Sequence, residues 1–202
     1  MNGLVRYEKQ VAISANERLT KADLELLQKA IRADYPELWW FNIDKMCTDA
    51  NGFIVTINIQ QVETSEIERL NKQLEDYIQG FAYQDLNSFH PVQKCYFLQS
   101  LLAKTVFYDK EEKDPFVQLH MRDIVGCFLV KRCVCAALGK GFKYLCDRFG
   151  VPCIYVTGVA NNDRHGWNMV KIGPYFYHVD PTWNLDNHAT SCYLLVDDRI
   201  IQ

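Results

Sequence analysis

Apolar residues recur at helical spacing in three segments of the first half of the chain. Residues 20–23, Thr-Lys-Ala-Asp, have the form of a capping box, and the helix that they open must end before Pro36. A second helix is predicted over 63–81, where apolar residues fall on one face. A third is predicted from Ser88, a suitable N-cap, with Pro91 tolerated in its first turn.

The clearest amphipathic pattern follows Cys135. Its apolar positions are spaced 4, 3 and 4 residues apart and form one face, which consists of Leu138, Phe142, Leu145 and Phe149. The helix is expected to stop at Gly150, because glycine commonly follows the last helical residue and Pro152 comes just beyond. The preceding stretch 108–123 is charged and contains a proline, so it is interpreted as a loop.

Strand signals occur in both halves of the chain and are most regular after residue 152. Residues 53–59 follow an Asn-Gly turn dipeptide and form one predicted strand, whereas 38–41 (Leu-Trp-Trp-Phe) fit either a strand or an aromatic plug. Three further strands are predicted at 153–159, 167–172 and 175–179, the last two joined by a Gly-Pro turn at 173–174. Helices followed by antiparallel strands indicate an α+β fold, with the Cys135 helix packed on the sheet. We expect a core over 88–202 and an appended helix and strand lobe over 1–87.

Composition narrows the class of protein. With 202 residues, 49% hydrophobic and 23% charged, the chain is long enough for a substantial core. A net charge of −3 without a basic helix face argues against nucleic-acid binding, and no apolar run is long enough to span a bilayer. No export signal is visible, so we expect a cytoplasmic protein unless a signal was removed. The eight cysteines show no metal-ligand spacing and lie mostly among apolar residues, which is typical of small buried hydrophobes in a reducing compartment.

Three residues could together perform thiol chemistry. Cys135 opens a helix, where unpaired N–H groups and the helix dipole favour a thiolate. It shares the buried face of its helix, whereas Cys133 does not. His165 begins a strand and Asp180 ends the adjacent one, with the turn at 173–174 about midway between them, so their side chains should meet across the hairpin. In this arrangement His165 would act as the base and Asp180 would orient its imidazole.

Each residue also has a plain structural interpretation. A cysteine on an apolar helix face is commonly packing, and Asp before Pro commonly initiates a turn. His178 shares the face of Asp180 and is a weaker alternative base. Trp167 and Trp183 are interpreted as core or pocket wall.

The motifs that carry these residues resemble the transglutaminase-like superfamily, whose core is related to the papain-type cysteine protease fold. The resemblance covers roughly residues 88–198. It is strongest over 135–150, at 165–168 (His-Gly-Trp-Asn) and at 177–183 (Tyr-His-Val-Asp-Pro-Thr-Trp).

The resemblance implies that Cys135 is the nucleophile, His165 the base and Asp180 the orienting acid. It further implies acyl transfer on peptide or protein amides through a cysteine thioester, ending in hydrolysis or in transfer to an amine. We therefore expect a protein or peptide substrate, and the oligomeric state is left open. The animal crosslinking enzymes of the family use calcium, but the chain has no Asp-x-Asp-x-Asp-Gly loop, so we expect neither a metal nor another cofactor.

The sequence departs from the bacterial pattern beside the nucleophile. Cys133-Val134 precede Cys135, where Gly-Val is usual, and 136–139 read Ala-Ala-Leu-Gly in place of Glu-Gly-Tyr-Ala. The stretch 124–127 offers no obvious side-chain donor to an oxyanion hole, which leaves the N–H of Cys135 as one donor and the second unassigned. These departures motivate an alternative function, an inactive transglutaminase-like module that binds a protein or peptide.

Overall fold

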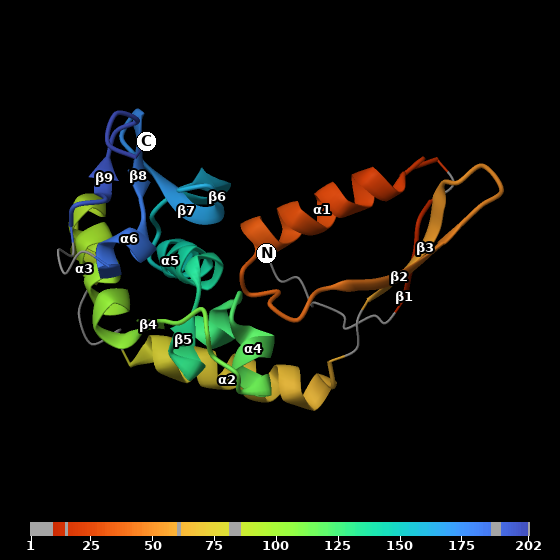
Figure 1. Cartoon of the computed structure of the whole chain (residues 1–202), viewed down its shortest axis with the longest axis horizontal. Helices are drawn as coiled ribbons and strands as arrows, with labels where there is room; N and C mark the ends of the chain where they lie inside the picture. The colour runs from red at the N-terminus through yellow and green to blue at the C-terminus, as the bar shows by residue number, and fades with distance from the viewer. Residues whose placement is uncertain (1–9, 15, 60–61, 81–85, 187–190, 202) are drawn as a thin grey trace.

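An antiparallel sheet formed by the last third of the chain packs against a helix that begins at Cys135 (Figure 1). The computed structural model describes residues 10–14, 16–59, 62–80, 86–186 and 191–201. Its helices are α1 (Lys21–Asp34), α2 (Thr64–Gln79), α3 (Pro91–Thr105), α4 (Pro115–His120), α5 (Cys135–Arg148) and α6 (Pro181–Asp186), with a 3₁₀ turn η1 (Leu86–Ser88) and a π-helical turn η2 (Gly126–Val130). Its strands are β1 (Gln10–Ala12), β2 (Ile43–Thr48), β3 (Ile54–Ile59), β4 (Phe107–Tyr108), β5 (Arg132–Cys133), β6 (Cys153–Ala160), β7 (Asp163–Ile172), β8 (Tyr175–Val179) and β9 (Leu194–Val196).

The main sheet has the order β6-β7-β8-β9, and every neighbouring pair is antiparallel. Asn161 and Asn162 have φ values of 52° and 61°, so β6 and β7 are joined by a two-residue turn of the kind that favours positive φ. Gly173, with φ 60°, turns the chain from β7 into β8. The predicted α+β class, with the Cys135 helix on an antiparallel sheet, is confirmed.

The main hydrophobic core lies around α5. Helix α5 contacts β6, β7, α3 and η2, and its inward side chains Ala137, Leu138, Phe142, Leu145 and Cys146 are fully buried. Side chains of α2 belong to the same core, and they are Leu70, Leu74 and Ile78. The division of the chain into two parts near residue 87 stays a prediction. Helix α2 comes before that point in the chain, but it packs in the core that surrounds α5.

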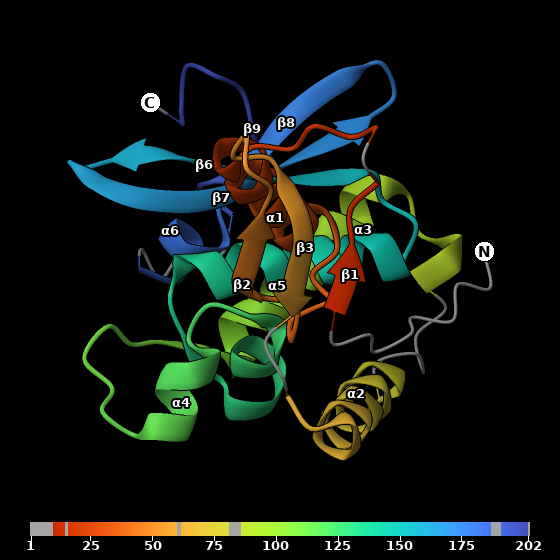
Figure 2. The same cartoon turned by 90° about the vertical axis from the view of Figure 1, so that its right-hand side faces the viewer.

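A smaller unit is formed by α1 and the antiparallel sheet β1-β3-β2. Figure 1 shows it extending from the main body, Figure 2 shows its three strands in front of that body, and α1 contacts β6. It has its own small core of Leu24, Ile54 and Ile57. The predicted capping box is present, since Thr20 Oγ1 accepts from the N–H of Asp23 and the Asp23 carboxylate accepts from the N–H of Thr20. This unit accounts for the helix and the strand predicted before residue 60.

Two predicted features are wrong, and for a third the structure decides between the two alternatives. The stretch 108–123 is not only a loop, because Asp114 accepts from the N–H groups of Phe116 and Val117 and thereby caps α4. The N-cap of α3 is His90 and not Ser88, because Pro91 occupies the first turn and the Nδ1 atom of His90 accepts from the next free N–H. The segment 38–41 forms turns and no strand, with one of its two indoles buried, which agrees with the aromatic plug.

No helix in the described ranges combines the length and the apolarity that a membrane span requires. All eight cysteines are free thiols, and five of them are buried, as expected for small apolar residues: Cys95, Cys127, Cys133, Cys146 and Cys153.

The close approach of α5 to η2 gives a test of this packing. A Cβ on Gly141 would lie 2.5 Å from the Sγ atom of Cys127 and 3.3 Å from Phe128, both buried. Gly141→Ala should therefore lower the free energy of unfolding by about 1–3 kcal/mol, despite the better helix propensity of alanine. Denaturant unfolding measures the change. In a Cys127→Ala background the same substitution should cost less, and an equal cost in both backgrounds would contradict the packing.

Candidate active site

Cys135 occupies the first turn of α5. Its N-cap, Val134, has no side-chain capping bond, and the carbonyl of Val134 accepts from the N–H groups of Ala137 and Leu138. The Cys135 side chain is half-buried, whereas Cys133 is fully buried in β5. Of the two cysteines, only Cys135 therefore combines a helix N-terminus with access from solvent.

His165 and Asp180 meet as the hairpin register predicts. The Nε2 atom of His165 lies 2.6 Å from the Oδ2 atom of Asp180, across the β7–β8 pair. His165 lies within β7, two residues after its first residue, because the two-asparagine turn lets the strand begin at Asp163. The turn between β6 and β7 is thus limited to Asn161 and Asn162.

Asp180 has a second structural task. It is fully buried, and its Oδ1 atom accepts from the N–H groups of Thr182 and Trp183 at 2.9 Å and 3.0 Å. It thereby caps α6, with Pro181 as the first helical residue. One carboxylate oxygen holds the helix and the other faces His165, which gives a physical reason for the order Asp-Pro-Thr-Trp.

The imidazole of His165 also bonds to the thiol of Cys135. Because Nε2 faces Asp180, we expect the other ring nitrogen, Nδ1, to be the one that bonds to the thiol. The sulfur additionally accepts from the N–H groups of Gly166 and Ala136. The structure thus brings together the three residues that the sequence analysis selected, with His165 in the middle.

Electrostatics favour an ion pair in this site. Burial by itself raises the pKa of the Cys135 thiol, but the bond and the charge of His165 and the two backbone N–H groups outweigh it and hold that pKa below its ordinary value. Burial by itself lowers the pKa of His165, but the bonds to Asp180 and Cys135 outweigh it and raise that pKa to about 9. Between these two pKa values the site holds a thiolate and an imidazolium.

Two indole rings lie nearly parallel to the imidazole of His165. The Trp183 ring centroid is 5.2 Å from that of His165 with an interplanar angle of 14°, and the Trp167 centroid is 6.0 Å away at 17°. Tyr193 packs edge-on against Trp183. Both tryptophans were interpreted as core or pocket wall, and the structure places them against the ring of His165.

Glycines at 139 and 166 let a tyrosine lie close to the thiol. A Cβ on Gly166 would lie 2.1 Å from the hydroxyl of Tyr155, and one on Gly139 would lie 2.7 Å from its ring. Burial, and secondarily the charge of Cys135, raise the pKa of Tyr155, so its hydroxyl stays protonated. Strand alternation indicates only that Tyr155 shares a face with residues 153 and 157. Its proximity to Cys135 depends on the approach of α5, which the sequence does not show.

Asn168, on β7, forms a hydrogen bond that links the sheet to α5. It is fully buried, and its Nδ2 atom donates to the carbonyls of Gly139 at 2.9 Å and Ile154 at 3.4 Å. The motif His-Gly-Trp-Asn therefore places four groups in one strand: the imidazole, a backbone N–H for the sulfur, an aromatic plane and an anchor for α5.

His178, the alternative base, bonds to residues other than Cys135. Its Nδ1 atom accepts from the indole Nε1–H of Trp167 at 3.0 Å, and its Nε2 atom lies 2.9 Å from the Oδ1 atom of Asp198. Both ring nitrogens are therefore engaged.

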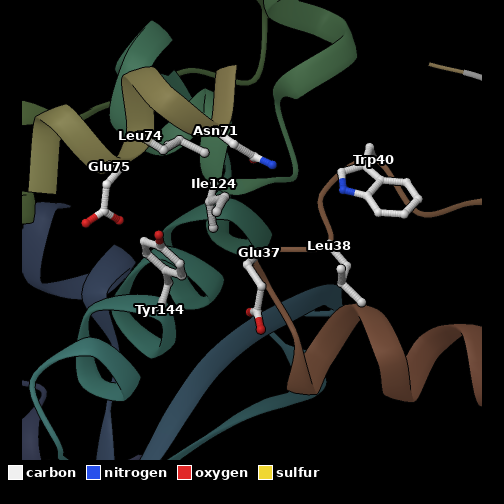
Figure 3. Close-up of a pocket in the computed structure, with 8 residues that line it drawn as sticks. All are labelled: Glu37, Leu38, Trp40, Asn71, Leu74, Glu75, Ile124 and Tyr144. Carbon is white, nitrogen blue, oxygen red and sulfur yellow. The ribbon is translucent and has the colours of Figure 1, made fainter. Parts of the chain in front are cut away.

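A hollow of about 200 Å³ lies elsewhere, between α2, α5 and the segment after α1 (Figure 3). Glu37, Asn71, Glu75 and Tyr144 line it, together with apolar side chains, and none of the three site residues does. In the part of the chain that the structure describes, no cluster of three or more His, Cys, Asp or Glu side chains could hold a metal ion.

Comparisons with known proteins give structural likeness only. No family model matches the chain, and no curated protein does. Among solved structures, the chain is similar to a TGase, with 14% identity, a TM-score of 0.37 and coverage of 90% of this chain and 53% of the other. It is also similar to a putative cysteine protease from Cytophaga hutchinsonii, with 16% identity, a TM-score of 0.41 and coverage of 70% and 62%.

The chain thus spans less than two thirds of either of these two structures. Both TM-scores are below 0.5, so the assignment of a function has to come from the geometry of the site itself.

Alkylation measures the predicted ion pair directly. Since the Cys135 pKa is lowered by His165, Cys135 should react with iodoacetamide faster at pH 6–7 than a model thiol, whose pKa is ~8.5. His165→Ala should slow this reaction in the same pH range, because only the two backbone N–H groups then oppose the effect of burial on the Cys135 pKa. Mass spectrometry of labelled peptides gives the rate, with the exposed Cys47 as internal reference. Equal labelling of Cys135 in both proteins would contradict the ion pair.

Proposed function

We propose that this protein is a cysteine-dependent acyl-transfer enzyme that acts on peptide or protein amides through a thioester on Cys135. One observation carries the proposal: a single imidazole, that of His165, bonds on one side to a thiol at a helix N-terminus and on the other to a fully buried carboxylate. A buried carboxylate and a half-buried thiolate are costly unless they are paired. Their pairing through one histidine is the arrangement that nucleophilic catalysis requires.

The acylation step follows from the atoms in place. The Cys135 thiolate attacks the amide carbonyl carbon, a C–S bond forms, and the carbonyl π electrons move to oxygen. The N–H of Cys135, one of the first donors of α5, is the expected donor to this oxyanion. The His165 imidazolium gives its proton to the amide nitrogen, the C–N bond breaks, and the amine leaves a thioester behind.

Deacylation reverses the roles. Neutral His165 takes a proton from water or from an amine, whose oxygen or nitrogen attacks the thioester carbonyl. The C–S bond then breaks and returns the thiolate, with the proton retained on His165. Water gives a hydrolase and an amine gives a crosslinking transferase, and the same three residues serve both.

The motif resemblance supports the same class. His-Gly-Trp-Asn and Asp-Pro-Thr-Trp resemble the transglutaminase-like pattern, and the residues in them have structural tasks that fit it: Asp180 orients His165, and Gly166 donates to the sulfur. A protein or peptide substrate remains part of this proposal.

Replacement of the nucleophile is the first test. Cys135→Ala should abolish acylation by p-nitrophenyl acetate, a small activated ester, and also turnover of any peptide amide. Cys133→Ala, two residues away and outside the site, should retain activity, and both variants should keep the wild-type circular dichroism. Residual burst release of p-nitrophenol from Cys135→Ala would contradict the proposal, and a wild-type protein without any burst would favour the inactive binding module.

Replacement of Asp180 tests the orienting role. In Asp180→Asn the amide oxygen can keep the two N–H bonds of α6, so the fold should be retained, but an N–H then faces the Nε2 atom of His165. We expect kcat to fall by ~10²-fold, less than the ~10⁴-fold of a serine-protease triad, because a preformed thiolate needs less help. The kinetics of p-nitrophenyl acetate hydrolysis check this. An unchanged kcat would show that Asp180 serves only to cap α6.

A further inference from the structure

A second hydrogen-bonded series lies behind the site. Asp198 Oδ1 is 2.9 Å from the Nε2 atom of His178, and the Nδ1 atom of His178 is 3.0 Å from the indole Nε1 of Trp167. The imidazole of His178 is nearly buried, whereas Asp198 is exposed. The series therefore runs from the surface, beyond β9, to an indole that lies parallel to the ring of His165.

The hydrogen-bond partners of His178 determine which of its ring nitrogens carries the proton. An indole N–H can only donate, so the Nδ1 atom of His178 must carry a lone pair. The proton of the neutral ring is then on Nε2, where it donates to the carboxylate of Asp198. Asp198 thus selects the tautomer that can accept from Trp167.

Two contacts determine the position of the Trp167 ring. A Cβ on Gly158 would lie 2.7 Å from the Cη2 atom of Trp167, so the ring lies directly against the backbone of β6. Gly158 is also the register partner of His165. At the pyrrole edge, His178 holds the indole N–H. The indole is therefore fixed by β6 on one side and by β8 on the other.

We propose that His178 is a positioning residue for the reaction: by accepting from Trp167, it holds the indole plane that keeps the imidazole of His165 aligned with Cys135 and Asp180. This inference rests on the proposed function. A rotation of the His165 ring out of its plane would weaken the bonds to Cys135 and to Asp180 together, since both leave the ring in that plane. A displaced Trp167 would permit such a rotation.

A matched pair of variants separates this role from mere packing. His178→Leu fills a similar volume but removes the acceptor, and leaves the indole N–H of Trp167 without its partner. His178→Asn keeps an acceptor oxygen near the position of Nδ1. The probe is iodoacetamide, and the readout is the rate of Cys135 alkylation at pH 6.5 and at pH 10.

At pH 6.5 we expect His178→Leu to react about tenfold more slowly than wild type, in line with the cost of an orphaned buried donor. His178→Asn should remain within about threefold of wild type. At pH 10, where an unassisted cysteine is already a thiolate, all three proteins should react alike. Two results at pH 6.5 would overturn the proposal. One is an equal rate of Cys135 alkylation in His178→Leu and in wild type, and the other is an equally slow rate in His178→Leu and His178→Asn.

A double-mutant cycle covers the case in which His178→Leu folds poorly. Trp167→Phe keeps an aromatic plane but has no N–H, so adding His178→Asn or His178→Leu to it should change the alkylation rate by less than about twofold. A full tenfold loss in that background would overturn the proposal. Slow alkylation of wild-type Cys135 below pH 7 would instead show that the proposed function itself is wrong, and the role of His178 would fall with it.

Discussion

The 2.6 Å contact between His165 and Asp180 is the interaction on which the arrangement of this molecule depends. Asp180 has no exposed surface, and a buried carboxylate is tolerated only when hydrogen bonds replace its hydration. Two of those bonds come from the first turn of α6 and one from His165, so the carboxylate joins a helix start to a strand. The β7–β8 hairpin must keep its register for this contact, because a slip by one residue would turn the imidazole to the other face. The same contact raises the pKa of His165, and His165 in turn lowers that of Cys135.

Several features around this contact serve to bring helix and sheet close enough. Gly139, Gly141 and Gly166 remove side-chain volume where α5 meets β6, η2 and β7, and Asn168 bonds across the gap. The sulfur can then reach the N–H of Gly166, and the imidazole can lie against two indoles. The short motifs of the sequence thus allow α5 to pack closely on the sheet, and they also supply the reactive groups. A substitution at one of these glycines would disturb this packing without replacing any of the three site residues.

Much of this could be predicted because local signals were strong. The capping box at Thr20, the apolar face of α5 and the turn at Gly173 have local causes, and the hairpin symmetry alone paired His165 with Asp180. Helix α4 was missed because charge and Pro115 concealed an Asp114 cap, a signal that was present in the sequence. The roles of Tyr155 and Asp198 could not be predicted, since each depends on an approach between segments distant along the chain. The role of His178 also needed the structure, because the sequence shows its face but not its bonding partners.

The charge on His165 at neutral pH tests this account most directly. NMR spectra that correlate the imidazole protons and nitrogens, assigned with a His165→Gln variant, report whether both ring nitrogens carry protons. We expect His165 to be an imidazolium from pH 6 to 8 and to lose its proton near pH 9, as its raised pKa of about 9 requires. In Cys135→Ala the loss should move to lower pH, because one of the two bonds that raise the pKa is gone. A neutral His165 at pH 7 in the wild-type protein would contradict the ion pair and, with it, the proposed chemistry.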